Sequence, residues 1–164
     1  RPSDPAPPES SGFMFNQILD RLLGVAQTSS EEPDALRTTV AALLVLVARM
    51  DDRFDDSERV AIRRILSTRF ALSGEATHAL LDAAERRVED SSQIYPFIQL
   101  AVERLDADQR VRLIELLWEV AYADGVLSPD EDALIRRIAG LIYVSDHDRG
   151  AARGRARRRL GLSD

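Results

Sequence analysis

Two pairs of acidic residues recur with the same spacing, and their carboxylates are the groups in this sequence best suited to holding a metal ion. Six residues separate Asp51 from Glu58, and six separate Asp124 from Glu131. Carboxylate oxygens are the ligands that Mg²⁺ and Ca²⁺ prefer, but this spacer is too short for the calcium loop of an EF-hand. We therefore predict a Mg²⁺ or Ca²⁺ site of another kind. Its predicted ligands are Asp51, Glu58, Asp124 and Glu131, with Asp55 and Asp130 as further candidates.

The same side chains also suit a structural role at helix starts. Asp55 with Glu58, and Ser128 with Glu131, have the spacing of a capping box, in which each side chain accepts from the other residue's backbone N–H. Pro129 strengthens the second start, because proline is favoured at the first helical position. Capping accounts for both glutamates but does not require Asp51 or Asp124. Metal binding and capping alone therefore both remain open.

The acidic pairs belong to an internal repeat. Shifted by 73 residues, segment 47–66 aligns with segment 120–139. The identical pairs include Val47/Val120, Ala48/Ala121, Asp51/Asp124, Glu58/Glu131, Ile62/Ile135, Arg63/Arg136, Arg64/Arg137 and Ile65/Ile138. We predict a duplicated helix–loop–helix, with copies at about 40–73 and 113–145 that pack about a pseudo-twofold axis. The paired arginines are expected on solvated faces or in a symmetric basic patch.

Hydrophobic periodicity of about 3.6 residues, with no strand pattern, predicts an all-α fold of about eight helices. A length of 164 residues suits one domain, or two small lobes that share a core. Residues 1–12 read as a flexible Pro/Ser-rich arm. Helices are expected over 13–26, from about 28 to Met50, over 55–70, 73–90, 91–105 and 106–124, from Ser128 onward, and over 145–160. In the helix over 73–90 the residues expected to face inward are Ala79, Leu80, Ala83, Ala84 and Val88.

Several classes of chemistry are excluded or disfavoured by composition. The chain has no cysteine, and all 22 of its basic residues are arginine, so thiolate, Schiff-base and P-loop lysine chemistry are absent. His78 and His147 are too isolated for a zinc site. No phosphate loop or nucleophile elbow is present. We expect a non-catalytic protein.

Positive charge gathers at the C-terminus of a chain whose net charge is −6. Residues 149–164 form an Arg-rich helix or tail, with a candidate basic patch at Arg153, Arg157, Arg158 and Arg159. Three roles remain open for it: a solvated or frayed helix, a segment folded back on the acidic body, or a contact with an acidic partner or, weakly, with anionic membrane. Nucleic acid is not expected, because aromatic side chains that stack on bases are missing there. The longest apolar run, 40–48, is too short to cross a bilayer, and a cytoplasmic location is expected.

These motifs resemble the tellurite-resistance protein B-like (TerB-like) family. The match is strongest over 113–148, is clear over 41–66 and 95–110, and covers roughly 14–150. The chain departs from the family pattern at Asp52, which stands where the second copy has Gly125 and is expected to need a positive φ. It departs again at Arg149-Gly150, where many relatives continue with a bulky apolar residue. The resemblance therefore gives no support for docking of the last helix.

The resemblance implies an all-helical domain, a compact two-lobed bundle, linked to bacterial tellurite resistance and stress response, with no secure enzymatic activity. It also implies metal chelation by acids at the positions of Asp51, Glu58, Asp124 and Glu131. A related domain occurs in membrane-anchored J-domain co-chaperones. The function expected from this likeness is divalent-cation binding without catalysis. The alternative is a metal-free interaction, scaffold or co-chaperone-like domain that docks an unidentified protein partner through its acidic and basic faces.

Overall fold

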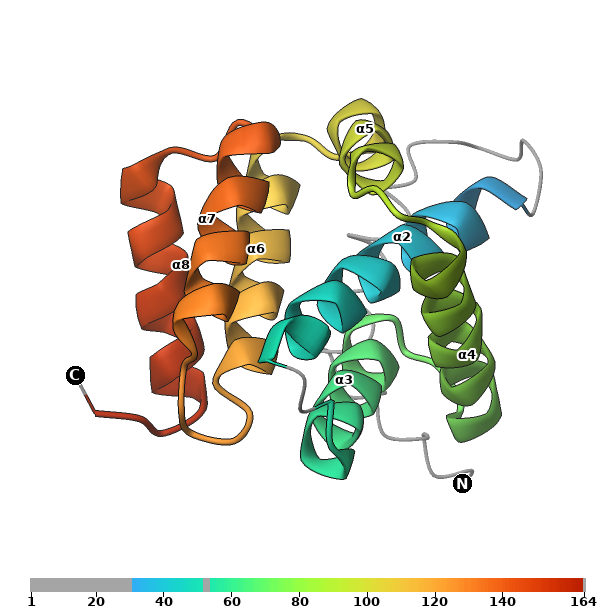
Figure 1. Cartoon of the computed structure of the whole chain (residues 1–164), viewed down its shortest axis with the longest axis horizontal. Coiled ribbons are helices and arrows are strands. Elements are labelled where there is room, and N and C mark those ends of the chain that lie inside the picture. The colour runs from blue at the N-terminus through green and yellow to red at the C-terminus, as the bar shows by residue number, and fades with distance from the viewer. Residues whose placement is uncertain (1–30, 52–53, 164) are drawn as a thin grey trace, which may run out of the picture.

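The computed structural model describes residues 31–51 and 54–163, with only the backbone described at 31–34 and 51. The described residues form seven α-helices and one 3-10 helix, with no strand (Figure 1). They are α2 (Glu31–Ala48), η1 (Arg49–Asp51), α3 (Asp56–Arg69), α4 (Gly74–Asp90), α5 (Tyr95–Arg104), α6 (Ala107–Ala121), α7 (Pro129–Leu141) and α8 (Asp146–Arg159). The predicted all-α fold is confirmed. The predicted arm over 1–12 and helix over 13–26 lie outside the described residues.

Most helices begin where a side chain satisfies backbone N–H groups that have no partner inside the helix. The N-cap side chains that accept such a bond are Asp55, Ser73, Asp106, Ser128 and Ser145. Helix α5 has no side-chain cap and instead carries Pro96 in its first turn. These bonds span only three residues, so the sequence around each start is enough to place it.

Two three-helix units, α2–α3–α4 and α6–α7–α8, end their second helix in the same way. After α3 the backbone turns left-handed at Ala71, and the Leu72 N–H donates to the Ser67 carbonyl at 3.1 Å. After α7 it turns left-handed at Tyr143, and the Val144 N–H donates to the Ala139 carbonyl at 2.9 Å. Both bonds close a Schellman motif. In each unit the third helix then packs on the first, α4 on α2 and α8 on α6. The structural repeat therefore runs on into α4 and α8, beyond the predicted copies over 40–73 and 113–145.

The units pack with the reciprocity that a pseudo-twofold relation requires. Helix α2 packs on its counterpart α6, while α3 contacts α6 and α2 contacts α7. When equivalent surfaces meet about a twofold axis, each element of one unit meets the reciprocal element of the other. In Figure 1 the helices α6, α7 and α8 stand together on one side, with α2 crossing toward them from the side of α3 and α4.

A single hydrophobic core joins the two units. Helix α2 is buried from Val40 to Val45 and again at Val47 and Ala48, so nearly every side of its C-terminal half is covered. A helix that is apolar all round belongs in the centre of a domain. The largest core side chain of the second unit is Trp118, 1% exposed. Within the described residues no helix is both long and apolar enough to span a membrane.

The buried face of α4 agrees with the predicted one at Ala84 and Val88 and differs elsewhere. Its buried residues are Thr77, Leu81, Ala84 and Val88, whereas Ala79 is exposed and Leu80 and Ala83 are only partly covered. Thr77 can be buried because its hydroxyl donates to the Ser73 carbonyl at 2.8 Å. In an alanine-rich helix the apolar residues spread over several faces, and the choice between them falls to packing.

Candidate functional site

The second acidic corner is a turn closed by a complete capping box. Helix α6 ends at Ala121, and the Asp124 carboxylate accepts from the Val126 N–H at 3.0 Å. Gly125 has φ of 83°, a left-handed conformation that glycine adopts without steric strain. The Ser128 hydroxyl then accepts from the Glu131 N–H at 3.1 Å, and Glu131 accepts from the Ser128 N–H at 2.9 Å. The Glu131 side chain is turned inward, with the residue only 1% exposed.

The first corner repeats this chemistry with an aspartate in place of the serine. Asp55 accepts from the Glu58 N–H at 3.1 Å, and Glu58 accepts from the Asp55 N–H at 3.3 Å. Glu58 is 3% exposed. The predicted capping boxes are therefore present in both copies. The side chain of Asp51, and all of Asp52 with its expected positive φ, lie outside the described residues.

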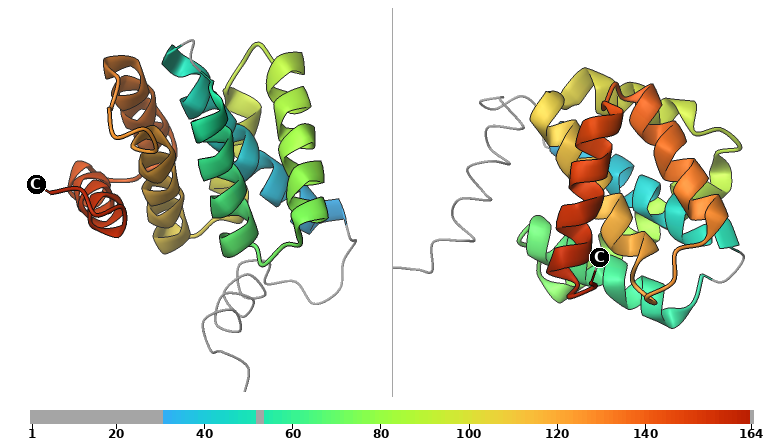
Figure 2. Two further views of the ribbon diagram at one scale, coloured as in Figure 1. Left: turned by 90° about the horizontal axis from the view of Figure 1, so that it is seen from below. Right: turned by 90° about the vertical axis from the view of Figure 1, so that its left-hand side faces the viewer.

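The two corners lie side by side at one end of the molecule. Element η1, which leads into the first corner, contacts α7, which leaves the second. Figure 1 shows the α6–α7 connection and the start of α3 at the same lower end, and both further views in Figure 2 agree. We call the exposed aspartates and large apolar residues of the two corners the two-turn face. Its members are Met50, Asp55, Asp56, Asp124, Val126 and Asp130.

The carboxylates of the two-turn face have the oxygen donors that Mg²⁺ and Ca²⁺ require. Among the described residues, however, no three His, Asp or Glu side chains gather closely enough to hold a metal ion. Glu58 and Glu131 accept backbone N–H bonds, and Asp124 accepts from the turn. The described acids therefore do not by themselves fit a metal centre.

The Arg-rich segment is a helix docked on the protein, not a solvated or frayed end. Helix α8 packs along α6 and buries Ala152 and Ala156. Of the predicted basic patch, Arg153 and Arg159 point to partners inside the protein, and Arg157 donates to the Ser163 carbonyl. Arg158 is exposed. Folding back on the acidic body, one of the three alternatives, is what the structure shows.

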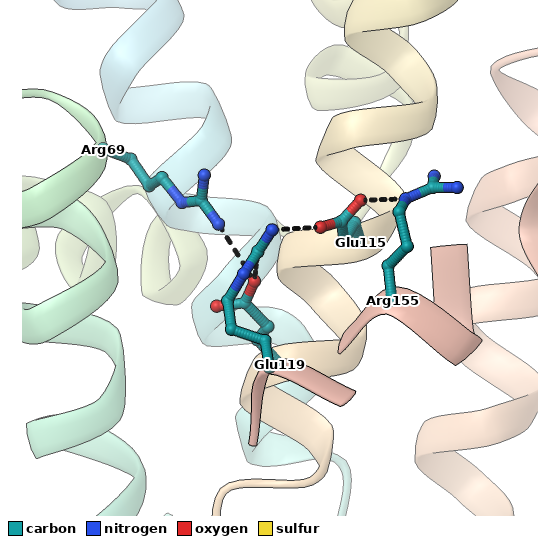
Figure 3. Close-up of polar contacts among 5 residues, drawn as sticks. Arg69, Glu115, Glu119 and Arg155 are labelled. Atoms are coloured by element: carbon teal, nitrogen blue, oxygen red, sulfur yellow. Dashed lines mark hydrogen bonds and ion pairs between the residues drawn. The ribbon is translucent and has the colours of Figure 1, made fainter. Parts of the chain in front are cut away.

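Two buried glutamates on α6 explain this docking, and neither was among the predicted site residues. Glu115 is 6% exposed and Glu119 is 5% exposed. Arg155 Nε lies 2.7 Å from Glu115, Arg159 lies 2.8 Å from the other Glu115 oxygen, and Arg159 also donates to Glu119. Arg69 of α3 reaches Glu119 at 3.1 Å (Figure 3). A sequence signal exists: both the glutamates and the arginines are spaced four apart, which puts each pair on one helical face.

Arg153 makes a second contact between the three helices of this unit. Its Nε donates to the Tyr122 hydroxyl at 2.6 Å, and its Nη1 lies 3.9 Å from Asp132 of α7. The guanidinium lies 5.1 Å from the centroid of the Trp118 ring, within the range of a cation–π contact. Helix α8 is therefore attached to the rest of its unit mainly through arginine side chains, where a helix usually packs through bulky apolar residues.

An all-helical domain made of two matching three-helix units, each turning through a capping box, is the class of protein that this fold defines. The family model described as Tellurite resistance protein TerB matches residues 37–154, well over half of the 164-residue chain. The chain belongs to the TerB family. Searches of curated proteins and of solved structures found no match.

Proposed function

We propose that this TerB-family chain is a non-catalytic binding domain of a bacterial tellurite- and stress-response system, acting in the cytoplasm. Its two-turn face would bind a basic, partly apolar segment of a partner protein. The observation that carries this proposal is the adjacency of the two equivalent turns, which gathers exposed acids from both copies at one end.

The composition of the two-turn face supports a partner of this chemistry. Asp55, Asp124 and Asp130 are exposed there and supply negative charge. In the same two corners Val126 is 70% exposed and Met50 is 40% exposed, although both are apolar. Charge complementarity steers a basic partner to such a surface and sets its orientation. Burial of exposed apolar side chains then stabilises the complex.

The test uses a synthetic amphipathic helical peptide with arginines on one face and leucines on the other, titrated into the chain by fluorescence anisotropy. Saturable binding is expected, weakened by Asp124→Asn with Asp130→Asn and separately by Val126→Ser. A matched control, Glu103→Gln with Asp108→Asn, removes the same charge from exposed positions elsewhere. If the two double variants have the same affinity for the peptide, binding depends only on the net charge of the chain, and the proposed face is wrong.

The second candidate is a divalent cation held by Asp51, Glu58, Asp124 and Glu131. It is favoured by the recurrence of both acids at equivalent places in adjacent turns. Such an ion would link the two turns and stabilise the folded chain by mass action. Calorimetric titration with Ca²⁺, Mg²⁺ and Mn²⁺, with melting temperature as a second readout, tests this candidate. Absence of heat and of any thermal shift at millimolar ion would reject it.

A further inference from the structure

A pocket of about 390 Å³ lies between α3, α6 and the end of α8. Helix α3 contributes Arg64, Ile65, Thr68 and Arg69, and helix α6 contributes Glu119. The end of α8 contributes Arg159 and the C-cap residue Leu160. Its volume falls at the lower end of the roughly 300–1,000 Å³ typical of small-molecule sites. It shares no residue with the two-turn face.

The pocket is positively charged although the chain carries a net charge of −6. Three guanidinium groups line it against one carboxylate, which leaves a surplus of two positive charges. A concave surface lined by one sign of charge concentrates ions of the opposite sign. The pocket therefore favours an anion.

The buried carboxylate of Glu119 fixes two of these arginines in place. One of its oxygens accepts both from Arg69 and from Arg159 (Figure 3 labels Arg69 and Glu119). Glu115 accepts from Arg159 as well, at 2.8 Å. Guanidinium groups that are already oriented lose less freedom when they bind a ligand. The site is thus partly built before any ligand arrives.

Arg64, the third arginine of the pocket, has an exposed side chain. Within the described part of the chain its guanidinium forms neither an ion pair nor a hydrogen bond. It presents a planar array of donors, and such an array matches the oxygens of a phosphate or carboxylate bidentately. Beside it, Thr68 adds a hydroxyl, and Ile65 and Leu160 add apolar surface.

We infer that this pocket binds a small doubly charged oxyanion, either free or as a phosphate monoester. Arg64 and Arg69 would contact the charged oxygens, and the organic part of an ester would lie against Ile65 and Leu160. This site is independent of the proposed partner face, so either can fail without the other.

The experiment titrates the full chain calorimetrically with glycerol 3-phosphate and, separately, with inorganic phosphate. Saturable one-to-one binding is expected. Arg64→Gln should weaken it about tenfold or more, because a charge-assisted hydrogen bond is lost. Tighter binding of the ester identifies an organic phosphate as the ligand, and equal affinities identify the free oxyanion.

The repeat supplies the matched control for this substitution. Arg137 is the counterpart of Arg64 in the other unit and is also exposed, but it does not line the pocket. Arg137→Gln removes the same charge and should leave the affinity unchanged, and neither variant should alter the melting temperature. The inference is overturned if both variants bind alike, or if the unaltered chain gives no saturable heat at millimolar ligand.

Discussion

Ala71 and Tyr143 close the second helix of each unit with the same left-handed backbone, at φ of 49° and 62°. Both residues are exposed. Neither is glycine, so both turns are held against the steric preference of the residue that occupies them. The turn geometry is imposed by the motif around it, in which the following apolar residue donates to a carbonyl of the last helical turn.

Ala71→Gly is expected to stabilise the chain by about 0.5 kcal/mol. Relief of left-handed strain contributes about 1 kcal/mol, and the greater freedom of glycine in the unfolded chain offsets part of it. Urea unfolding measures the change. Ala79→Gly is the matched control, because Ala79 is an exposed interior residue of α4; it should cost about 1 kcal/mol. Destabilisation by both substitutions would show that Ala71 is not strained.

Glu119→Gln is expected to lower the free energy of unfolding by about 2 kcal/mol, because it removes the charge that Arg69 and Arg159 share. The loss stays below that of a fully buried pair since the two arginine side chains are 23% and 44% exposed. Urea unfolding gives the value. Glu89→Gln serves as control: Glu89 is 63% exposed beside Arg49, and its loss should cost less than about 0.5 kcal/mol.

The same substitution should loosen α8 more than the rest of the chain. This helix buries only Ala152 and Ala156, so little hydrophobic burial holds it in place. Hydrogen exchange at the α8 amides is expected to accelerate in the Glu119→Gln variant while the α2 amides keep their protection. Equal acceleration in both helices would mean that α8 does not open separately.

Ser128→Ala should cost about 1 kcal/mol, because the Glu131 N–H loses the hydroxyl that caps it at 3.1 Å. Chemical unfolding provides the measurement. Ser92→Ala, in the exposed α4–α5 connection, is the control and should change the stability by no more than a few tenths of a kcal/mol. An equal loss in both variants would show that the capping box adds nothing to stability.

Arg153→Gln is expected to destabilise the chain by about 1–2 kcal/mol and to make Trp118 more accessible to acrylamide. The substitution removes the bond to the Tyr122 hydroxyl and the guanidinium above the indole ring. Tryptophan fluorescence is specific here since the chain has one Trp. Arg158→Gln changes an exposed residue of the same helix and should leave the quenching unchanged. Greater quenching in that control would point to general fraying of α8.

The sequence by itself determined the capped helix starts, the repeat and the family, whereas the uncapped helix α5 begins at Tyr95 and not at the predicted residue 91. Asp55 with Glu58, and Ser128 with Glu131, cap their helices through bonds between residues three apart, so the local sequence contains everything the interaction needs. The duplicated pattern over 47–66 and 120–139 likewise identified the matching capped starts of α3 and α7.

Only the tertiary structure decided which faces are buried and which charges meet. Arg155 and Arg159 lie 40 residues from their glutamate partners, and Arg69 lies 50 residues from Glu119. No local pattern shows that such groups will be neighbours, because their contact depends on how α3 and α8 pack on α6. For the same reason the buried side of α4 and the arginine pocket depend on how the helices pack. Packing determines at once which apolar surface is buried and which distant charges are paired.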